Sequence, residues 1–190
     1  MEVSKALLKR RTIRKFTQEK LNKQDLEKLL EYARLAAYPS NMQPLKFSII
    51  TDAKMIEKIF PNTKWAGYLP ETGTPKDGER PTAYIAVLGD KSIKQSFEVE
   101  AGAAVTSMML GAFDMGIASC WLGAINRKNL MKIFNLSEEN FDLLYLLALG
   151  YPAQKSDICE VKDDIKYFEL PDGQICVPKR SLEEITIKVD

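Results

Sequence analysis

The stretch from Ala101 to Ala118 is the longest apolar segment of the chain, and it constrains the fold more than any other feature. Asp114 and three glycines interrupt it, so it is predicted to be a buried helix rather than a membrane span. Gly102, Ala103, Ala104, Ser107 and Gly111 give the helix expected over 98–115 a face of small residues, and Gly116 follows as a C-cap. This helix is interpreted as the central helix of the chain.

Helical and strand patterns follow one another irregularly along the 190 residues. The apolar spacing predicts helices over 3–9, 23–37 and 127–134, short helices after Asp52 and Ser137, strands over 46–51, 83–88, 117–122 and 143–149, a hairpin of 167–170 with 174–177, and an extended segment over 185–189. Regular βαβ order is missing, so the expected fold class is α+β. No repeat or boundary divides the sequence, so residues 1–190 are expected to form one domain.

The charges of the chain nearly cancel, with 27 Lys and Arg against 26 Asp and Glu. A nucleic-acid-binding protein usually carries a basic excess, so that class of partner is not expected, and neither is a membrane. Positive charge must instead be concentrated locally, which suits a small anion.

The sequence holds no histidine, which removes the commonest general base, the commonest metal ligand and every Ser-His or Cys-His nucleophile. No Gly-x-Gly-x-x-Gly or Walker-type loop is present. The carboxylates form no recognisable acid/base pair. We therefore expect no metal and no obligatory catalytic side chain, with the chemistry supplied by a cofactor.

Three cysteines, Cys120, Cys159 and Cys176, lie far apart in the sequence without a Cys-x-x-Cys pair. This usage predicts neither a disulfide framework nor a zinc site, and it is typical of a reducing compartment. The first residues are charged before any apolar run, unlike a signal peptide. The expected location is cytoplasmic.

Two basic clusters lie near the ends of the chain. The first contains Arg10, Arg11, Thr12 and Arg14, and the second contains Lys179 and Arg180. Each taken singly is consistent with a solvated helix end or a surface charge pair. Taken together, guanidinium and ammonium groups suit a phosphate dianion.

A polar turn follows the helix expected over 23–37, with Pro39, Ser40, Asn41 and Gln43 before Pro44. Such residues commonly fill turns, so a purely structural role is an alternative. The two basic clusters and this turn, in this order, resemble the nitroreductase family of flavin mononucleotide (FMN) enzymes. The segment from Ser119 to Ala124 and Gly150-Tyr151-Pro152 add to the resemblance.

The resemblance implies a nitroreductase-like, FMN-binding α+β fold with a central mixed or antiparallel sheet flanked by helices. It also implies an intertwined homodimer with two flavin sites between the subunits. The turn would reach the site of the partner subunit, and the C-terminal segments would embrace the partner. The central apolar helix would pack at the interface.

The resemblance also implies roles for single residues. Arg10 would meet the flavin phosphate, and Arg11 and Thr12 the ribityl–phosphate region. Arg14 would lie near N1 and the C2 carbonyl, where a cation stabilises the reduced ring. Lys179, with Arg180 beside it, would close on the phosphate.

The turn and the Ser119–Ala124 segment would contact the rest of the flavin. Pro39, Ser40, Asn41 and Gln43 would contribute to the flavin site, and the backbones of Leu122 and Gly123 would face N5. Trp121 is interpreted as a core residue and Cys120 as a small buried residue.

By the same resemblance, the activity would be a ping-pong transfer of hydride from NADH or NADPH, through flavin N5, to a nitroaromatic, a quinone or an enone. An FMN-binding storage or sensing protein is the alternative, and a nonflavin interaction protein with the same fold is another. The proline- and glycine-rich loop over 61–81, with Trp65 and Tyr68, is either an ordered surface loop or part of a substrate pocket.

Overall fold

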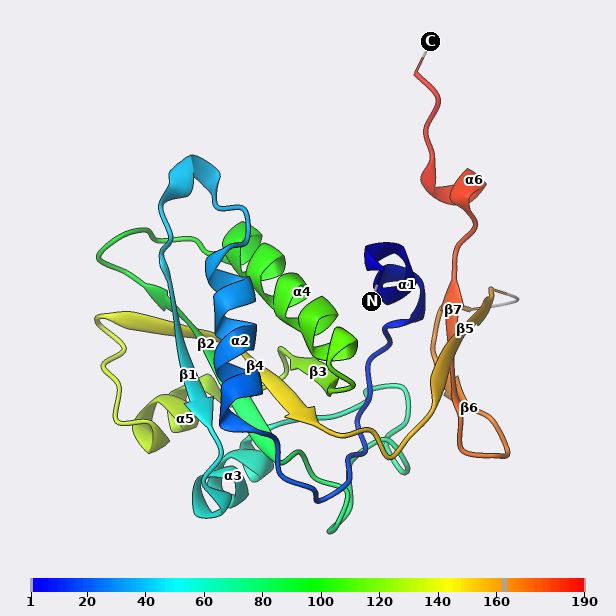
Figure 1. Cartoon of the computed structure of the whole chain (residues 1–190), viewed down its shortest axis with the longest axis horizontal. Helices are drawn as coiled ribbons and strands as arrows, with labels where there is room; N and C mark the ends of the chain where they lie inside the picture. Colours follow the sequence, from blue (N-terminus) through cyan, green and yellow to red (C-terminus); the bar gives the residue numbers. More distant parts are fainter. Residues whose placement is uncertain (1, 162–163, 190) are drawn as a thin grey trace.

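A four-stranded antiparallel sheet forms the centre of the molecule in the computed structural model, which describes residues 2–161 and 164–189 (Figure 1). Its strands are β1 (Leu45–Ile50), β2 (Ala83–Asp90), β3 (Ala118–Leu122) and β4 (Phe141–Gly150), in the spatial order β1-β2-β4-β3. The predicted strands are confirmed, with ends shifted by one or two residues. Because β3 is an edge strand, one of its sides is open to other segments.

Both faces of the sheet are covered, and the sequence of β2 shows why. Successive side chains of a strand point to opposite faces. Tyr84, Ala86 and Leu88 belong to one hydrophobic cluster, and Ile85 and Val87 belong to the cluster on the other face. A strand that is apolar at every position therefore needs a packed layer on each side.

Helices α2 (Lys23–Arg34) and α4 (Glu98–Asp114) cover one face. Asn22 caps α2 as predicted, since its side chain accepts a hydrogen bond from Gln24 N. The helix ends three residues before Ala37, the predicted end. Tyr38 Oη donates to the Ala33 carbonyl over 2.8 Å and satisfies one of the last acceptors of the helix.

Helices α3 (Ala53–Ile59) and α5 (Arg127–Ile133) cover the other face, together with the 3₁₀ turn η2 (Phe60–Asn62). Asp52 caps α3, with its carboxylate accepting from Met55 N over 2.8 Å. The helix predicted after Ser137 is wrong. Ser137 instead begins a turn, because β4 already starts at Phe141 and leaves too few residues for a helix.

A second, three-stranded sheet is separate from the first and lies beside α1 (Val3–Lys9) in Figure 1. Its strands are β5 (Ser156–Glu160), β6 (Phe168–Glu169) and β7 (Ile175–Lys179). The predicted hairpin is confirmed by the antiparallel pair β6–β7, whereas β5 pairs with β7 in parallel and was not predicted.

The same sheet corrects the expectation for the cysteines, because Cys159 and Cys176 form a disulfide. Parallel pairing of β5 with β7 brings these two positions, 17 residues apart, to a Cα–Cα distance of 5.8 Å. The composition could not show this, since the pairing is a long-range event. The cysteine usage consequently no longer supports a reducing compartment.

The chain ends in an arm that extends away from the second sheet (Figure 1). It begins with α6 (Leu182–Ile185), a short helix where only an extended segment from Ile185 was predicted. Ser181 and Glu184 form a reciprocal capping box that stabilises this turn. Within the described residues, no helix has the length and apolar character that crossing a membrane requires.

Candidate functional site

The basic N-terminal segment runs along the open edge of β3. Thr12 forms a parallel bridge with Ser119, and Ile13 N donates to the Ser119 carbonyl over 3.1 Å. Further along, Phe16 bridges Pro152 just beyond β4. The segment that follows α1 is thereby fixed to the edge of β3 and to the residues just beyond β4.

Arg10 and Arg11 lie together at the end of α1. The Arg11 guanidinium donates to the Arg10 carbonyl over 2.5 Å and to the Leu8 carbonyl over 2.6 Å. Arg10 Nη1 and Arg11 Nε are buried and have no hydrogen-bond partner among the described residues. Burial, and then the charge of Arg11, lower the pKa of Arg10. Such a pair of cations is arranged for an anion.

A pocket of about 370 Å³ opens beside these arginines. Its lining includes Ser156, whose buried Oγ also has no partner among the described residues. Sequence reasoning missed Ser156 and its neighbours Gln154 and Lys155, because a polar run after Pro152 carries no motif. Three residues with an unpartnered polar atom thus line one cavity, and its volume lies within the 300–1,000 Å³ of most ligand sites.

Arg14 lies further along the segment and is held from both the backbone and the side chain. Its N–H donates to Gln154 Oε1 over 3.3 Å, and its guanidinium carbon lies 4.6 Å from the centroid of the Tyr167 ring. Tyr167 was not among the predicted site residues.

Strand β3 leads from the pocket to Leu122 and Gly123. Trp121 is half-buried and packs edge-on against Tyr145, with ring centroids 5.0 Å apart. Cys120 is buried, and burial raises its pKa to about 11, an effect that the positive charge of Arg14 opposes. Its interpretation as a small buried residue is confirmed.

The polar turn lies at the far end of α2, remote from Arg10 within one chain (Figure 1). It forms the 3₁₀ turn η1 (Pro39–Asn41), in which Ser40, Asn41 and then Gln43 all have positive φ, between 48° and 52°. Non-glycine residues avoid this region, and such strain clusters at functional sites. One chain does not bring the turn and the arginines together.

The C-terminal basic pair lies at the end of β7, away from the pocket lining. Ser156, at the pocket, pairs with Ile175, while Lys179 pairs with Glu160 at the other end of the two strands. Arg180 is exposed and lies 3.5 Å from Glu184. The contact of Lys179 and Arg180 with a phosphate therefore stays a prediction.

The loop over 61–81 divides into a buried and an exposed part. Trp65 is buried, and its indole N–H donates to Thr63 Oγ1 over 2.8 Å, so it belongs to the core. Tyr68 is half exposed and makes a tilted ring contact with Tyr167, with ring centroids 5.0 Å apart.

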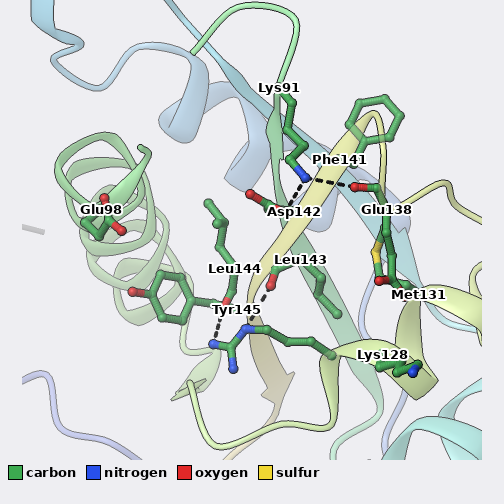
Figure 2. Close-up of a pocket in the computed structure, with 11 residues that line it drawn as sticks. Lys91, Glu98, Lys128, Met131, Glu138, Phe141, Asp142, Leu143, Leu144 and Tyr145 are labelled. Atoms are coloured by element: carbon green, nitrogen blue, oxygen red, sulfur yellow. Dashed lines mark hydrogen bonds and ion pairs between the residues drawn. The ribbon is translucent and has the colours of Figure 1, made fainter. Parts of the chain in front are cut away.

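A second cavity, of about 500 Å³, lies near the start of β4 (Figure 2). Several of its charged groups already have partners within the protein. Lys91 pairs with Asp142 over 3.2 Å, and Arg127 donates to the carbonyls of Leu143 and Leu144 at the β-bulge of β4. Unlike the pocket beside Arg10, it contains no unpartnered buried side-chain atom among the described residues. We therefore place the candidate site at the smaller pocket.

Relatives of the chain share its length and its fold. It is 29% identical over 169 residues, 85% of this chain and 92% of the relative, to a "Putative NADH dehydrogenase/NAD(P)H nitroreductase" of Archaeoglobus fulgidus. A "putative nitroreductase in complex with fmn" from Desulfovibrio desulfuricans superposes with a TM-score of 0.73 at 24% identity, covering 100% of this chain and 98% of the other.

A third comparison gives the same fold. A nitroreductase family protein from Clostridium difficile has a TM-score of 0.66 at 25% identity, with 81% of this chain and 86% of the other covered. The sequence model of the Nitroreductase family matches residues 7–151, from α1 to the end of β4. With the antiparallel sheet, the central helix and the basic segment along β3 all in place, this chain belongs to the nitroreductase family.

Proposed function

We propose that this chain is an FMN-dependent oxidoreductase that transfers hydride from NADH or NADPH to a small acceptor such as a nitroaromatic, a quinone or an enone. The observation that carries the proposal is the pocket lined by Arg10, Arg11 and Ser156, each of which has a buried side-chain atom without a hydrogen-bond partner among the described residues. The names of the relatives, which include NAD(P)H nitroreductases and one FMN complex, support it.

The residues of the pocket fit the phosphate end of FMN. Arg10 and Arg11 would neutralise the dianion, and the Ser156 hydroxyl would donate a further hydrogen bond. Thr12 is held against β3 by its bridge to Ser119 and would adjoin the ribityl chain. Binding would then satisfy polar atoms whose burial otherwise destabilises the fold.

The ring end of FMN would lie along the edge of β3. The backbones of Leu122 and Gly123, at the end of this strand, would approach the ring, and Arg14 would place a positive charge beside it. When bound, FMN would accept hydride from the nicotinamide and pass it on in a second half-reaction. No side-chain acid or base is assigned, since solvent can supply the proton.

The site would be completed by a second copy of the chain. Apolar side chains are exposed on α1, at Val3, Leu7 and Leu8, and along the C-terminal arm, at Leu182 and Ile187. Exposed apolar surface of this extent marks an interaction site. In a homodimer the strained turn at Ser40, Asn41 and Gln43 would reach the partner's flavin, with Pro39 beside it.

The test begins with a titration of the protein with FMN, followed by anaerobic addition of NADH or NADPH. We expect binding, bleaching of the flavin by at least one donor, and reoxidation by a quinone. Arg10→Gln removes one charge-assisted contact of roughly 1.5–3 kcal/mol and should weaken FMN binding about 10- to 150-fold. Lys54→Gln, an exposed lysine on α3, is the control and should leave binding unchanged.

Two outcomes would contradict the proposal. Binding of FMN that neither nicotinamide reduces would indicate a storage or sensing protein. Absence of FMN binding at any concentration would indicate a protein that keeps the fold for another interaction.

A further inference from the structure

The guanidinium of Arg14 lies over an aromatic ring. The Tyr167 ring lies 4.6 Å from the guanidinium carbon, and the backbone N–H of Arg14 is tied to Gln154. Arg14 forms no ion pair with a carboxylate among the described residues. The guanidinium is therefore not committed to a carboxylate within these residues and can meet a ligand.

The Tyr167 ring is itself supported from a different part of the chain. The Tyr68 ring, in the loop over 61–81, contacts it in a tilted arrangement, with centroids 5.0 Å apart and an interplanar angle of 54°, and Tyr68 N–H donates to Tyr167 Oη over 3.5 Å. Tyr167 also packs against the hydrophobic cluster that contains Tyr84 and Leu88.

The disulfide restrains the segment that carries this ring. Cys159 and Cys176 close a loop that includes Tyr167, and both cysteines belong to the second sheet. The ring is thereby restrained by the disulfide-closed loop, by its contact with Tyr68 and by packing against the core. A rigid partner of this kind removes conformational freedom from the arginine that lies on it.

We propose that Tyr167 is a positioning residue that holds the Arg14 guanidinium toward the flavin ring and so sets the site's preference for reduced over oxidised FMN. The proposal rests on the proposed function, since it needs FMN in the site. Reduction adds negative charge to the ring, and a fixed cation favours the charged form more than a mobile, hydrated one does. Contact with an aromatic ring holds the cation without occupying its N–H groups with a carboxylate.

The experiment measures the midpoint potential of FMN bound to the wild-type protein and to the variants Tyr167→Phe and Tyr167→Leu. Phenylalanine keeps the aromatic face, so Y167F should keep the wild-type potential. Leucine keeps the apolar bulk but loses the face. In Y167L the preference for reduced over oxidised FMN should be roughly three- to tenfold weaker than in the wild type. A tenfold weaker preference lowers the midpoint potential by about 30 mV.

A double variant tests whether Tyr167 acts through Arg14. In an Arg14→Gln background, Tyr167→Leu should cause no further change in potential, because the cation that the ring positions is gone. Tyr167→Met has the same expectation as Y167L and answers the question should Y167L fail to fold.

The outcomes separate this inference from the proposed function. If the wild-type protein binds no FMN, the proposed function and this inference both fail. If FMN binds and Y167L keeps the wild-type potential, only the inference fails. It also fails if Y167F shifts the potential as far as Y167L, or if the shift persists in full when Arg14 is absent.

Discussion

The Cβ and Cδ1 atoms of Phe16 both lie 2.9 Å from the point where any other residue at position 150 would place its Cβ. Phe16 is fully buried and ends the basic segment, and Gly150 ends β4. The glycine therefore permits the segment that carries Arg10 and Arg14 to dock on the sheet. The close approach of the Phe16 side chain, rather than a turn, requires glycine here.

Gly150→Ala should destabilise the protein. The added methyl would overlap the root of the Phe16 side chain, which cannot move without its backbone, and overpacking of this kind costs about 1–3 kcal/mol. Urea unfolding measures the loss. Gly67→Ala is the control, because a Cβ there meets nothing within 4 Å, and equal stability of the two variants would contradict the packing argument.

Reduction of the disulfide should lower stability. A covalent closure of 17 residues restricts the unfolded chain and is worth about 3 kcal/mol. We expect a lower denaturation midpoint in dithiothreitol than without it. The Cys159→Ser, Cys176→Ser double variant should show the lower midpoint in both conditions, and a response of that variant to dithiothreitol would point to another cause.

Cys120 should make stability fall at high pH. Burial raises its folded pKa to about 11, from an ordinary value near 9. Below pH 9 the thiol is neutral in both the folded and the unfolded state, and the stability contributed by Cys120 is complete. Between pH 9 and 11 the unfolded state loses the thiol proton more readily than the fold does, so this stability is lost as the pH rises. Two pKa units correspond to about 2.7 kcal/mol. The difference between wild type and Cys120→Ala, from unfolding curves at pH 8 to 11, should shrink over this window.

Ser40→Gly should stabilise the ligand-free protein. Ser40 has φ of 51°, a region that glycine occupies without penalty, so the gain should approach about 1 kcal/mol. Thermal unfolding measures it. Ala37→Gly, three residues earlier and outside the positive-φ residues, should lose stability instead. If the turn serves a flavin site, Ser40→Gly should also weaken FMN binding.

Leu182→Asp with Ile187→Asp should convert the proposed homodimer into monomers. Both side chains are at least 80% exposed, and burying two carboxylates in an apolar interface is unfavourable. Light scattering at micromolar concentration distinguishes the two masses. Lys188→Asp, in the same arm, should remain dimeric. A wild-type monomer would refute the two-chain site.

Local patterns determined a large part of this protein. The period of two in β2 and the caps at Asn22 and Asp52 act within a few residues, so each could be predicted from the sequence. The basic motif at Arg10 could also be predicted, because its residues are adjacent in the chain.

Long-range pairing decided the rest. Tyr167 meets Arg14 across more than 150 positions, Ser156 reaches the arginine pocket through β5, and Cys159 meets Cys176 because two short strands pair in parallel. Short strands carry weak periodicity, and no neighbouring residue reports which distant one they will contact. Only the tertiary structure places these groups, since the packing of the whole chain selects their partners.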